Sequence, residues 1–299
     1  MRDSQIIYTE QLTKYYGRIA GVKEISFEVN RGEIFGFLGP NGAGKTTTIR
    51  LLLDLLRPTS GKIVIFGKDV KSNSFEIRQK CGYLPGNFSA YGNLTGKEFL
   101  NLLADLRKVP RYIEPGLLDR FGLANGDLKR KIKHLSHGTL QKLGIIQAFF
   151  HRPELLILDE PTTGLDPLMQ EEFYDLLHKY QNMGCTTFFS SHNLSEVEKV
   201  CHRLAIIRKG EIVAIESIED MKKKLYRKLE LTLRKPLDRF ELPGARIIKK
   251  QGLKYEFIVT GRKDTLLKSL ADLPLEDFVF PRPDLEEVFM NYYRDQRDD

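Results

Sequence analysis

The chain has 299 residues, a length that predicts about two domains at roughly 100 to 200 residues per domain. Hydrophobic residues make up 41% of it and charged residues 29%, which is typical of a globular protein and excludes disorder as the main state. The net charge of +7 permits nucleic acid or acidic lipid as a partner but requires neither. No apolar run approaches the roughly 18 residues of a membrane span, and the first residues lack the pattern of a signal peptide. We therefore expect a chain that is not secreted and whose membrane role would depend on a partner.

Three cysteines, Cys81, Cys185 and Cys201, are scattered without CxxC spacing. An odd number without that spacing favours neither a disulfide framework nor a zinc site. We expect free thiols in a reducing compartment.

Up to about residue 216, short apolar runs alternate with longer amphipathic segments, a pattern that predicts an α/β domain. We expect strands at 34–38, 155–158 and 185–189. A helix is expected at 46–56, with apolar residues at i, i+3, i+4 and i+7, and another at 173–180.

Residues 88–152 are expected to be mostly helical and to form a helical subdomain inserted in the α/β core. Phe99, Leu102, Leu103 and Leu106 have the spacing of one apolar helix face. Segment 140–150 is apolar on more than one face, as in a buried helix.

A hairpin over 204–215, with its turn at Lys209-Gly210, is expected to close a first domain of residues 1–216. Five of the seven residues at 222–228 are basic, which indicates a linker or a solvated helix face. Residues 217–299 are expected to form a small α+β domain. Its predicted elements are strands at 229–233, 255–259 and 278–280, a helix at 265–271, and a last helix that Asp284 caps.

One segment matches the phosphate-binding pattern G-x-x-x-x-G-K-[ST], and it lies between a predicted strand and a predicted helix, where the mechanism requires it. Backbone N–H groups of such a loop surround phosphate oxygens, its lysine contacts the β- and γ-phosphates, and the hydroxyl that follows binds Mg²⁺. Thr47 adds a further hydroxyl. The loop comprises Gly39, Pro40, Asn41, Gly42, Ala43, Gly44, Lys45 and Thr46.

Two acids follow the predicted strand at 155–158. Phosphoryl transfer needs a carboxylate that holds the metal and a group that orients or deprotonates the attacking water. We assign the first role to Asp159, together with Thr46, and the second to Glu160.

These residues resemble the ATP-binding subunits of ABC transporters over about residues 5–216, and further motifs match in order. Residues 135–139 (LSHGT) stand where that family has LSGGQ, Asp166 ends a segment similar to the D-loop, and His192 resembles the switch histidine. Tyr16 resembles the aromatic residue that stacks on adenine, with Tyr15 as the alternative. The implied fold is a P-loop NTPase core of the ABC ATPase type with an inserted helical subdomain.

The resemblance implies a homodimer that closes on two ATP molecules with Mg²⁺. In such a dimer, Ser136 and the Gly138 N–H of one chain would contact the γ-phosphate bound by the other, and Asp166 would lie at the interface. Glu160 would act as the base, and His192 would contact the γ-phosphate or the attacking water.

Two departures from the family pattern bear on these expectations. His137 and Thr139 replace the Gly and Gln of LSGGQ, whereas both residues expected to contact phosphate are kept. Gly86 follows Tyr83-Leu84-Pro85 where the family has the Q-loop glutamine, and a glycine has no side chain with which to bind Mg²⁺.

The form of these motifs, together with LEEVF at 285–289, is similar to that of drug-resistance and sodium-export ATPases. That branch implies an ATPase at the cytoplasmic face of the membrane that serves a separate permease and drives export. The alternatives are an importer ATPase, or an ABC ATPase that acts on nucleic acid or ribosomes. We expect no nucleic-acid partner, because the chain has a single ATPase motif set and no zinc module.

Overall fold

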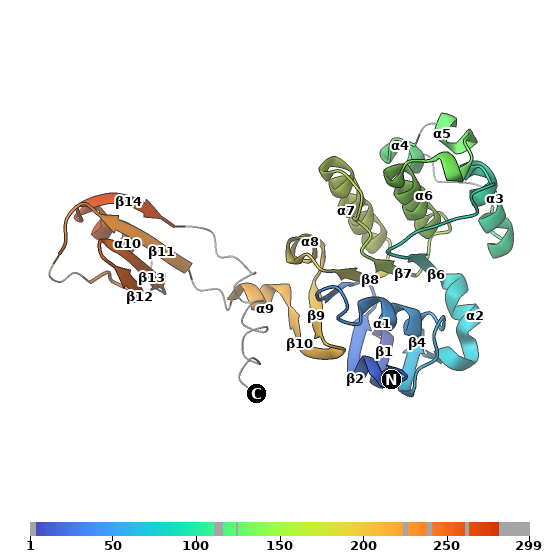
Figure 1. Ribbon diagram of the computed structural model, residues 1–299, viewed down its shortest axis with the longest axis horizontal. Coiled ribbons are helices and arrows are strands. Elements are labelled where there is room, and N and C mark those ends of the chain that lie inside the picture. The colour runs from blue at the N-terminus through green and yellow to red at the C-terminus, as the bar shows by residue number, and fades with distance from the viewer. Residues whose placement is uncertain are drawn as a thin grey trace. The chain divides into compact units, whose positions relative to one another are not determined.

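The computed structural model describes residues 4–110, 116–123, 125–223, 227–237, 241–260 and 263–280. The chain divides into two compact units, Met1–Ile218 and Glu219–Asp299 (Figure 1). Each unit is described by itself.

The first unit is built on a six-stranded sheet with the order β10-β9-β3-β8-β7-β6. All neighbouring strands are parallel except the antiparallel hairpin of β9 and β10. β3, β7 and β8 are buried along their whole length, as expected for parallel strands with both faces covered. The strands are β3 (Ile34–Leu38), β6 (Cys81–Leu84), β7 (Leu155–Asp159), β8 (Thr186–Ser191), β9 (Arg203–Arg208) and β10 (Glu211–Ser217).

A second, antiparallel sheet with the order β2-β1-β4-β5 was not predicted from the sequence. Its strands are β1 (Gln5–Tyr16), β2 (Ile19–Asn30), β4 (Ser60–Ile65) and β5 (Lys68–Asp69). Register shifts interrupt the β1–β2 pairing, and Gln11 and Glu24 adopt φ values of 46° and 51°, so the regular alternation of apolar residues is broken. Phe27 packs on the central sheet, with its ring centroid 5.9 Å from that of Phe35 and 5.6 Å from that of Phe37.

Helices cover both faces of the central sheet (Figure 1). α1 (Lys45–Leu52) lies between the two sheets, whereas α6 (His137–Phe149), α7 (Pro167–Asn182) and α8 (Leu194–Val200) lie on the other face. The remaining helices are α2 (Val70–Lys80), α3 (Gly96–Arg107), α4 (Leu117–Arg120), α5 (Asn125–Lys129) and the 3₁₀ turn η1 (Ile132–His134). α3 to α6 occupy the segment that was expected to be helical.

Two predicted helix bounds are wrong, and one predicted helix face is only partly right. α1 ends at Leu52 rather than at residue 56, because Asp54 adopts a left-handed φ of 53°. α6 begins at His137, three residues before the predicted start near Leu140. The predicted apolar face of α3 is buried only in part, since Phe99 is buried and Leu103 half-buried, whereas Leu102 is 36% exposed and Leu106 67% exposed.

The second unit is a four-stranded antiparallel sheet with the order β12-β13-β11-β14. Its strands are β11 (Arg227–Leu233), β12 (Ala245–Gln251), β13 (Lys254–Val259) and β14 (Leu275–Val279), and its helices are α9 (Ile218–Lys223) at the junction and α10 (Lys263–Ala271). Alternate residues of β11 and β13 form a separate core with α10, in which Leu231, Phe257 and Leu266 are each 1% exposed. The last strand begins three residues before its predicted start, and the predicted helix after Asp284 lies outside the described residues.

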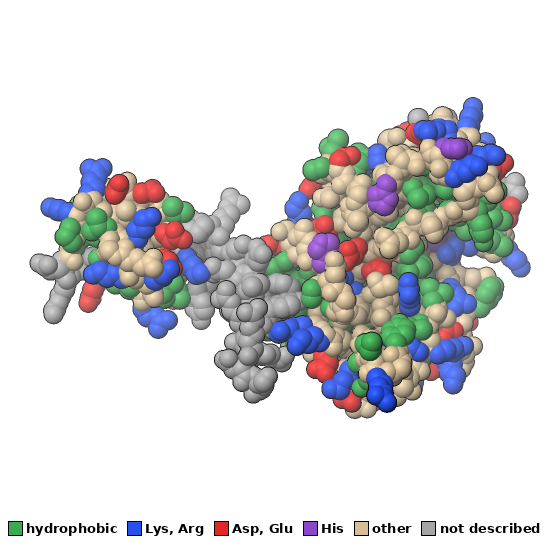
Figure 2. All heavy atoms as spheres, viewed as in Figure 1, with side chains coloured by type: hydrophobic (Ala, Val, Ile, Leu, Met, Phe, Trp, Pro, Cys, Tyr) green, Lys and Arg blue, Asp and Glu red, His purple; other side chains and the backbone are tan. Residues whose placement is uncertain are grey.

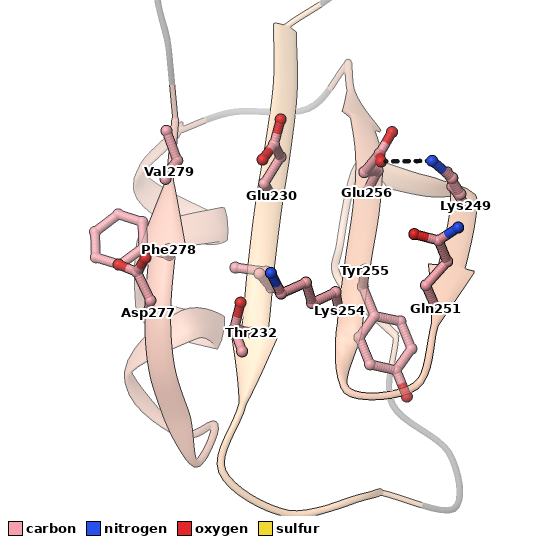
Figure 3. A pocket seen from close by; sticks show the side chains of 11 residues that line it. Glu230, Thr232, Lys249, Gln251, Lys254, Tyr255, Glu256, Asp277, Phe278 and Val279 are labelled. Carbon is pink, nitrogen blue, oxygen red and sulfur yellow. Dashed lines mark ion pairs between the residues drawn. The ribbon is translucent and has the colours of Figure 1, made fainter.

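The opposite face of this sheet carries polar side chains around a hollow of about 160 Å³ (Figure 3). Lys249 and Glu256 form an ion pair of 3.5 Å across β12 and β13, and Glu230 lies beside them on β11. Across the described ranges of both units, no helix combines the length and hydropathy that a bilayer crossing requires.

Candidate functional site

The candidate site lies at the carboxyl ends of four neighbouring strands, β6, β7, β8 and β3. Gly39, Gly86, Asp159 and His192 each follow or end one of these strands. Loops at this edge of a parallel sheet are where ligands of open α/β folds bind.

The P-loop between β3 and α1 depends on glycines. Gly42 and Gly44 adopt φ values of 80° and 112°, which residues with a Cβ avoid. Gly39 packs so closely on β9 that a Cβ there would lie 2.4 Å from the Ile207 carbonyl oxygen. The Ala43 carbonyl accepts a hydrogen bond of 2.9 Å from the N–H of Gly210 in the β9–β10 turn. This hairpin, which is distant in sequence, therefore supports the P-loop.

Lys45 is 5% exposed and lies across its own loop, where its ammonium group donates to the Gly39 and Pro40 carbonyl oxygens at 2.8 and 3.1 Å. The same group forms an ion pair of 3.1 Å with Glu160. The positive charge that would face a phosphate is therefore balanced by the carboxylate expected to act as the base.

Asp159 is 3% exposed, and both of its oxygens accept hydrogen bonds. The Thr46 hydroxyl donates to Oδ2 at 2.8 Å, and the Ser190 hydroxyl donates to Oδ1 at 2.6 Å. The pKa of the nearby Tyr83 phenol is raised to about 12, first by burial and then by the charge of Asp159, so Tyr83 stays neutral. The paired hydroxyl and carboxylate oxygens of Thr46 and Asp159 are the hard donors that Mg²⁺ prefers, and they fit a magnesium site.

Glu160 directly follows β7 and adopts a left-handed φ of 47°. Its backbone N–H still donates to the Ser190 carbonyl oxygen at 3.1 Å, which continues the parallel pairing of β7 and β8 by one residue. Its carboxylate contacts His192, with 3.0 Å between Oε2 and Nδ1. The structure thus brings together the five polar residues that the sequence placed at the reaction centre, namely Lys45, Thr46, Asp159, Glu160 and His192.

Tyr16 ends β1 on the P-loop side of the unit. It is 46% exposed, and its hydroxyl lies 3.5 Å from the Thr47 hydroxyl. Its ring lies against Gly21, where a Cβ would come within 2.7 Å of Cε2. This arrangement favours Tyr16 over Tyr15 as the aromatic residue at the nucleotide.

The LSHGT segment and the D-loop meet each other within one chain. Ser136 is the N-cap of α6 and accepts from the Thr139 N–H at 3.2 Å, and Asp166 is the N-cap of α7 and accepts from the Met169 N–H at 3.0 Å. The His137 ring lies against Gly164, where an added Cβ would come within 2.8 Å of the ring. Within the described residues, no hydrogen bond or ion pair joins Ser136, Gly138 or Asp166 to the P-loop.

Gly86 lies against Asp159. A Cβ at this position would lie 3.3 Å from the Asp159 carbonyl oxygen and 3.5 Å from Oδ2. A longer side chain at this position would therefore start beside Asp159, and the glycine leaves that space open.

Sequence reasoning missed Ser190 and Glu196. Ser190 holds Asp159, and Glu196 accepts hydrogen bonds from Thr162 and Ser191. The sequence signal for Ser190 is the polar run Ser190-Ser191-His192 at the end of a buried strand, and Glu196 lies outside that run.

A parallel sheet with a glycine-rich strand-to-helix loop, a lysine at its helix start and an acidic strand end defines a P-loop nucleoside triphosphatase. The model of the ABC transporter family matches residues 22–163. The chain is 41% identical to the bacitracin transport ATP-binding protein BcrA of Bacillus licheniformis over 234 residues, which are 77% of this chain and 76% of BcrA. It is also 41% identical to an uncharacterised ABC transporter ATP-binding protein of Nostoc sp. over 228 residues, 72% of this chain and 68% of that one.

A solved ATP-binding subunit of an ABC transporter has a TM-score of 0.69 and 30% identity, and the match covers 73% of this chain and 92% of the other. The chain therefore belongs to the ATP-binding subunits of ABC transporters, and it is an ATPase of that family.

Proposed function

We propose that this chain hydrolyses ATP as a homodimer and thereby drives a separate membrane permease, in the direction of export. The observation that carries the proposal is the convergence of Lys45, Thr46, Asp159, Glu160 and His192 at one edge of the sheet. Each has the chemistry that one part of phosphoryl transfer requires. The first unit is the ATPase, and the second is an accessory unit.

Lys45 binds the phosphates of ATP, and Glu160 promotes hydrolysis. Without nucleotide, the Lys45 ammonium pairs with Glu160 at 3.1 Å. When ATP binds, Lys45 moves to the β- and γ-phosphate oxygens, and the released Glu160 carboxylate accepts a proton from the attacking water. His192 donates a hydrogen bond near the γ-phosphate and keeps Glu160 oriented through the contact of 3.0 Å.

Thr46 and Asp159 would hold Mg²⁺. When bound, the ion neutralises the charge that develops on the phosphate oxygens. Ser190 fixes the Asp159 carboxylate through the hydrogen bond of 2.6 Å. Because Gly86 has no side chain, it would not contribute a ligand to Mg²⁺, and Thr46 and Asp159 are the residues that would hold the ion.

Ser136, Gly138 and Asp166 act across the dimer. Ser136 and Gly138 lie at the N-terminus of α6, a helix of 13 residues whose free N–H groups and dipole favour an anion. Because no hydrogen bond or ion pair among the described residues joins them to their own P-loop, we assign them to the γ-phosphate of the second chain. Asp166, exposed at the N-terminus of α7, is assigned to the interface.

The permease would dock on the helical subdomain. Leu102, Leu106 and Tyr91 expose 36%, 67% and 70% of their surface, and Figure 2 shows hydrophobic side chains over α3. Exposed apolar side chains on one helix, such as those of α3, are typical of protein interfaces. We infer export of a drug, lipid-like molecule, peptide or ion, and the name of the relative BcrA, a bacitracin transport protein, favours a drug or peptide among these. The docked chain would lie on the cytoplasmic face of the membrane.

The first prediction concerns Glu160→Gln. The amide cannot accept the proton of the attacking water, so we expect ATP to bind with wild-type affinity while kcat falls by roughly 100-fold or more. Lys45→Ala is the counterpart, in which nucleotide binding itself weakens. Steady-state phosphate release and equilibrium binding of labelled ATP separate the two effects. Wild-type turnover in Glu160→Gln would show that Glu160 is not the base.

The second prediction concerns the partner. We would capture tagged Glu160→Gln protein with Mg-ATP from detergent-solubilised membranes of the organism that makes it. A polytopic membrane protein should be captured with it. Leu106→Asp in the same protein should lose that partner but keep its ATP binding, because Leu106 is exposed and lies outside the site. Recovery of ribosomal components or nucleic acid alone would contradict the permease proposal and favour a nucleic-acid function.

A further inference from the structure

Glu196 joins two loops that each carry one of the residues at the reaction centre. From the first part of α8, its carboxylate accepts a hydrogen bond of 2.9 Å from the Thr162 hydroxyl through Oε1. Oε2 accepts one of 2.7 Å from the Ser191 hydroxyl. Thr162 and Ser191 are 4% and 1% exposed, so both bonds are shielded from water. Hydrogen bonds to an ionised acceptor are about twice as strong as neutral ones.

The two hydroxyls belong to residues within two positions of Glu160 and His192. Thr162 lies two residues after Glu160, in a turn in which the Thr163 N–H donates to the Glu160 carbonyl oxygen at 3.2 Å. Ser191 directly precedes His192, and its own hydroxyl oxygen accepts from the Asn193 N–H at 2.9 Å. One carboxylate thus holds both chain segments at the point where they leave the sheet.

The sheet itself does not fix the two side chains. The last backbone hydrogen bond between these segments runs from the Glu160 N–H to the Ser190 carbonyl oxygen at 3.1 Å, so His192 lies beyond the pairing. Glu160 also has a left-handed φ of 47°, which other residues must hold in place. His192 is 54% exposed at its side chain, and its contact of 3.0 Å with Glu160 therefore needs support from the segments behind it.

We propose that Glu196 is a positioning residue for ATP hydrolysis, which keeps Glu160 and His192 in register by holding Thr162 and Ser191 with one carboxylate. This inference rests on the proposed roles of Glu160 and His192. Glu196 would touch neither ATP nor the attacking water, so it would affect turnover rather than ATP binding.

Four variants test the proposal in the full-length protein. Glu196→Ala removes both hydrogen bonds, and Glu196→Gln keeps an acceptor for one hydroxyl and an amide that donates to the other. Glu171→Ala is the matched control. It removes a carboxylate of α7 that forms an exposed ion pair of 2.6 Å with Lys199, and Lys199 lies on α8 like Glu196. His192→Ala, alone and combined with Glu196→Ala, completes a double-mutant cycle.

We expect Glu196→Ala to lower kcat by roughly 10-fold or more and to leave the KM for ATP within about twofold, because small misplacements of catalytic groups are costly. Glu196→Gln and Glu171→Ala should stay within about twofold of the wild-type kcat. In the His192→Ala background, Glu196→Ala should cost less than about twofold, because the pairing that it supports is already absent. Should Glu196→Ala fail to fold, as judged by its melting curve, Thr162→Val in the same cycle replaces it.

Wild-type kcat in Glu196→Ala, or an equal fold loss with and without His192, would overturn the inference. A loss in Glu171→Ala as large as that in Glu196→Ala would also overturn it, since the effect would then belong to the anchoring of α8 in general. Glu160→Gln, measured in parallel, separates the two proposals. If kcat is low in Glu160→Gln but wild-type in Glu196→Ala, only the positioning role of Glu196 is wrong. If kcat is wild-type in Glu160→Gln, the proposed function of the site is itself wrong.

Discussion

The charged residues of the site are paired with each other or hydrogen-bonded. Lys45 and Glu160 neutralise each other at 3.1 Å, and Asp159 is satisfied by two hydroxyls. Buried charges are tolerated when they are paired and hydrogen-bonded in this way. In the proposed mechanism, a triphosphate competes with Glu160 for Lys45, so that substrate binding also releases the proposed base.

His151, just beyond the end of α6, makes the unit sensitive to acid. Its Nε2 lies 3.1 Å from the Cys81 carbonyl oxygen, and its buried Nδ1 finds no hydrogen-bond partner among the residues that the structure describes. The pKa of His151 is lowered to about 4, first by burial and then by the charge of Arg107. The neutral ring is therefore favoured by the fold, so its contribution to stability is complete above the unfolded pKa of about 6.5 and is lost as the pH falls toward 4.

His151→Phe removes the imidazole that titrates, so its stability should depend less on pH than that of the wild type. Between about pH 7.5 and pH 5, the free energy of unfolding of the wild type should fall by about 2 kcal/mol more than that of His151→Phe. Urea unfolding followed by circular dichroism at both values measures it. Parallel pH profiles for the two proteins would show that His151 does not titrate on unfolding.

Individual site residues differ in how well the sequence reveals them. Lys45 and Thr46 belong to a fixed spacing in one segment, and Asp159 and Glu160 end a clear apolar run, so their proximity follows from the order of strands in a parallel sheet. Glu196 and Ser190 have no such spacing, because they act through contacts between loops that are distant in sequence.

At the scale of elements, the N-terminus of α6 has two tasks. Ser136 caps the helix, with its side chain accepting from the Thr139 N–H at 3.2 Å, and in the proposed dimer it faces a phosphate. A cap is worth about 1 kcal/mol, and Asp is as good a cap as Ser. An Asp at this position would place a negative charge against the γ-phosphate.

Ser136→Asp and Ser136→Ala should therefore separate the two tasks. We expect Ser136→Asp to keep the wild-type melting temperature and to lose most ATPase activity, whereas Ser136→Ala should lose about 1 kcal/mol of stability and part of the activity. Thermal melts and phosphate release measure the two effects. Normal turnover in Ser136→Asp would contradict the contact with phosphate.

Apolar periodicity identified the buried strands and the long helices, but it failed where chain geometry intervenes. Leu56 keeps the helical spacing of α1 and packs against the core, although the helix has already ended at Leu52. Leu102 and Leu106 of α3 also have that spacing, yet they face outward, where a partner could cover them. The irregular pairing of β1 and β2 left no alternation by which the second sheet could be recognised.

At the scale of the whole molecule, each unit has its own core. That of the second unit joins alternate residues of β11 and β13 to Leu266 and Leu270 of α10. Calorimetry of the full chain should therefore show two unfolding transitions. With Glu160→Gln, ATP and Mg²⁺ at about 100 times the dissociation constant should stabilise the first unit by about 2.7 kcal/mol and leave the other transition unmoved. Lys45→Ala is the control, and a single transition that moves as one would show that the units unfold together.

The hydrogen bond between Gly210 and Ala43 has a consequence for protein synthesis. The P-loop leaves the ribosome early, but the turn that supports it, at 2.9 Å, comes near the end of the first unit. Between the two events lie on the order of 10 to 30 s, at roughly 5 to 20 residues per second. β8 and β9, which flank β3, are also made late. A nascent chain thus carries the complete motif long before the β9–β10 turn that supports the P-loop has been translated, and we expect ATP to stabilise the chain only after that turn is made.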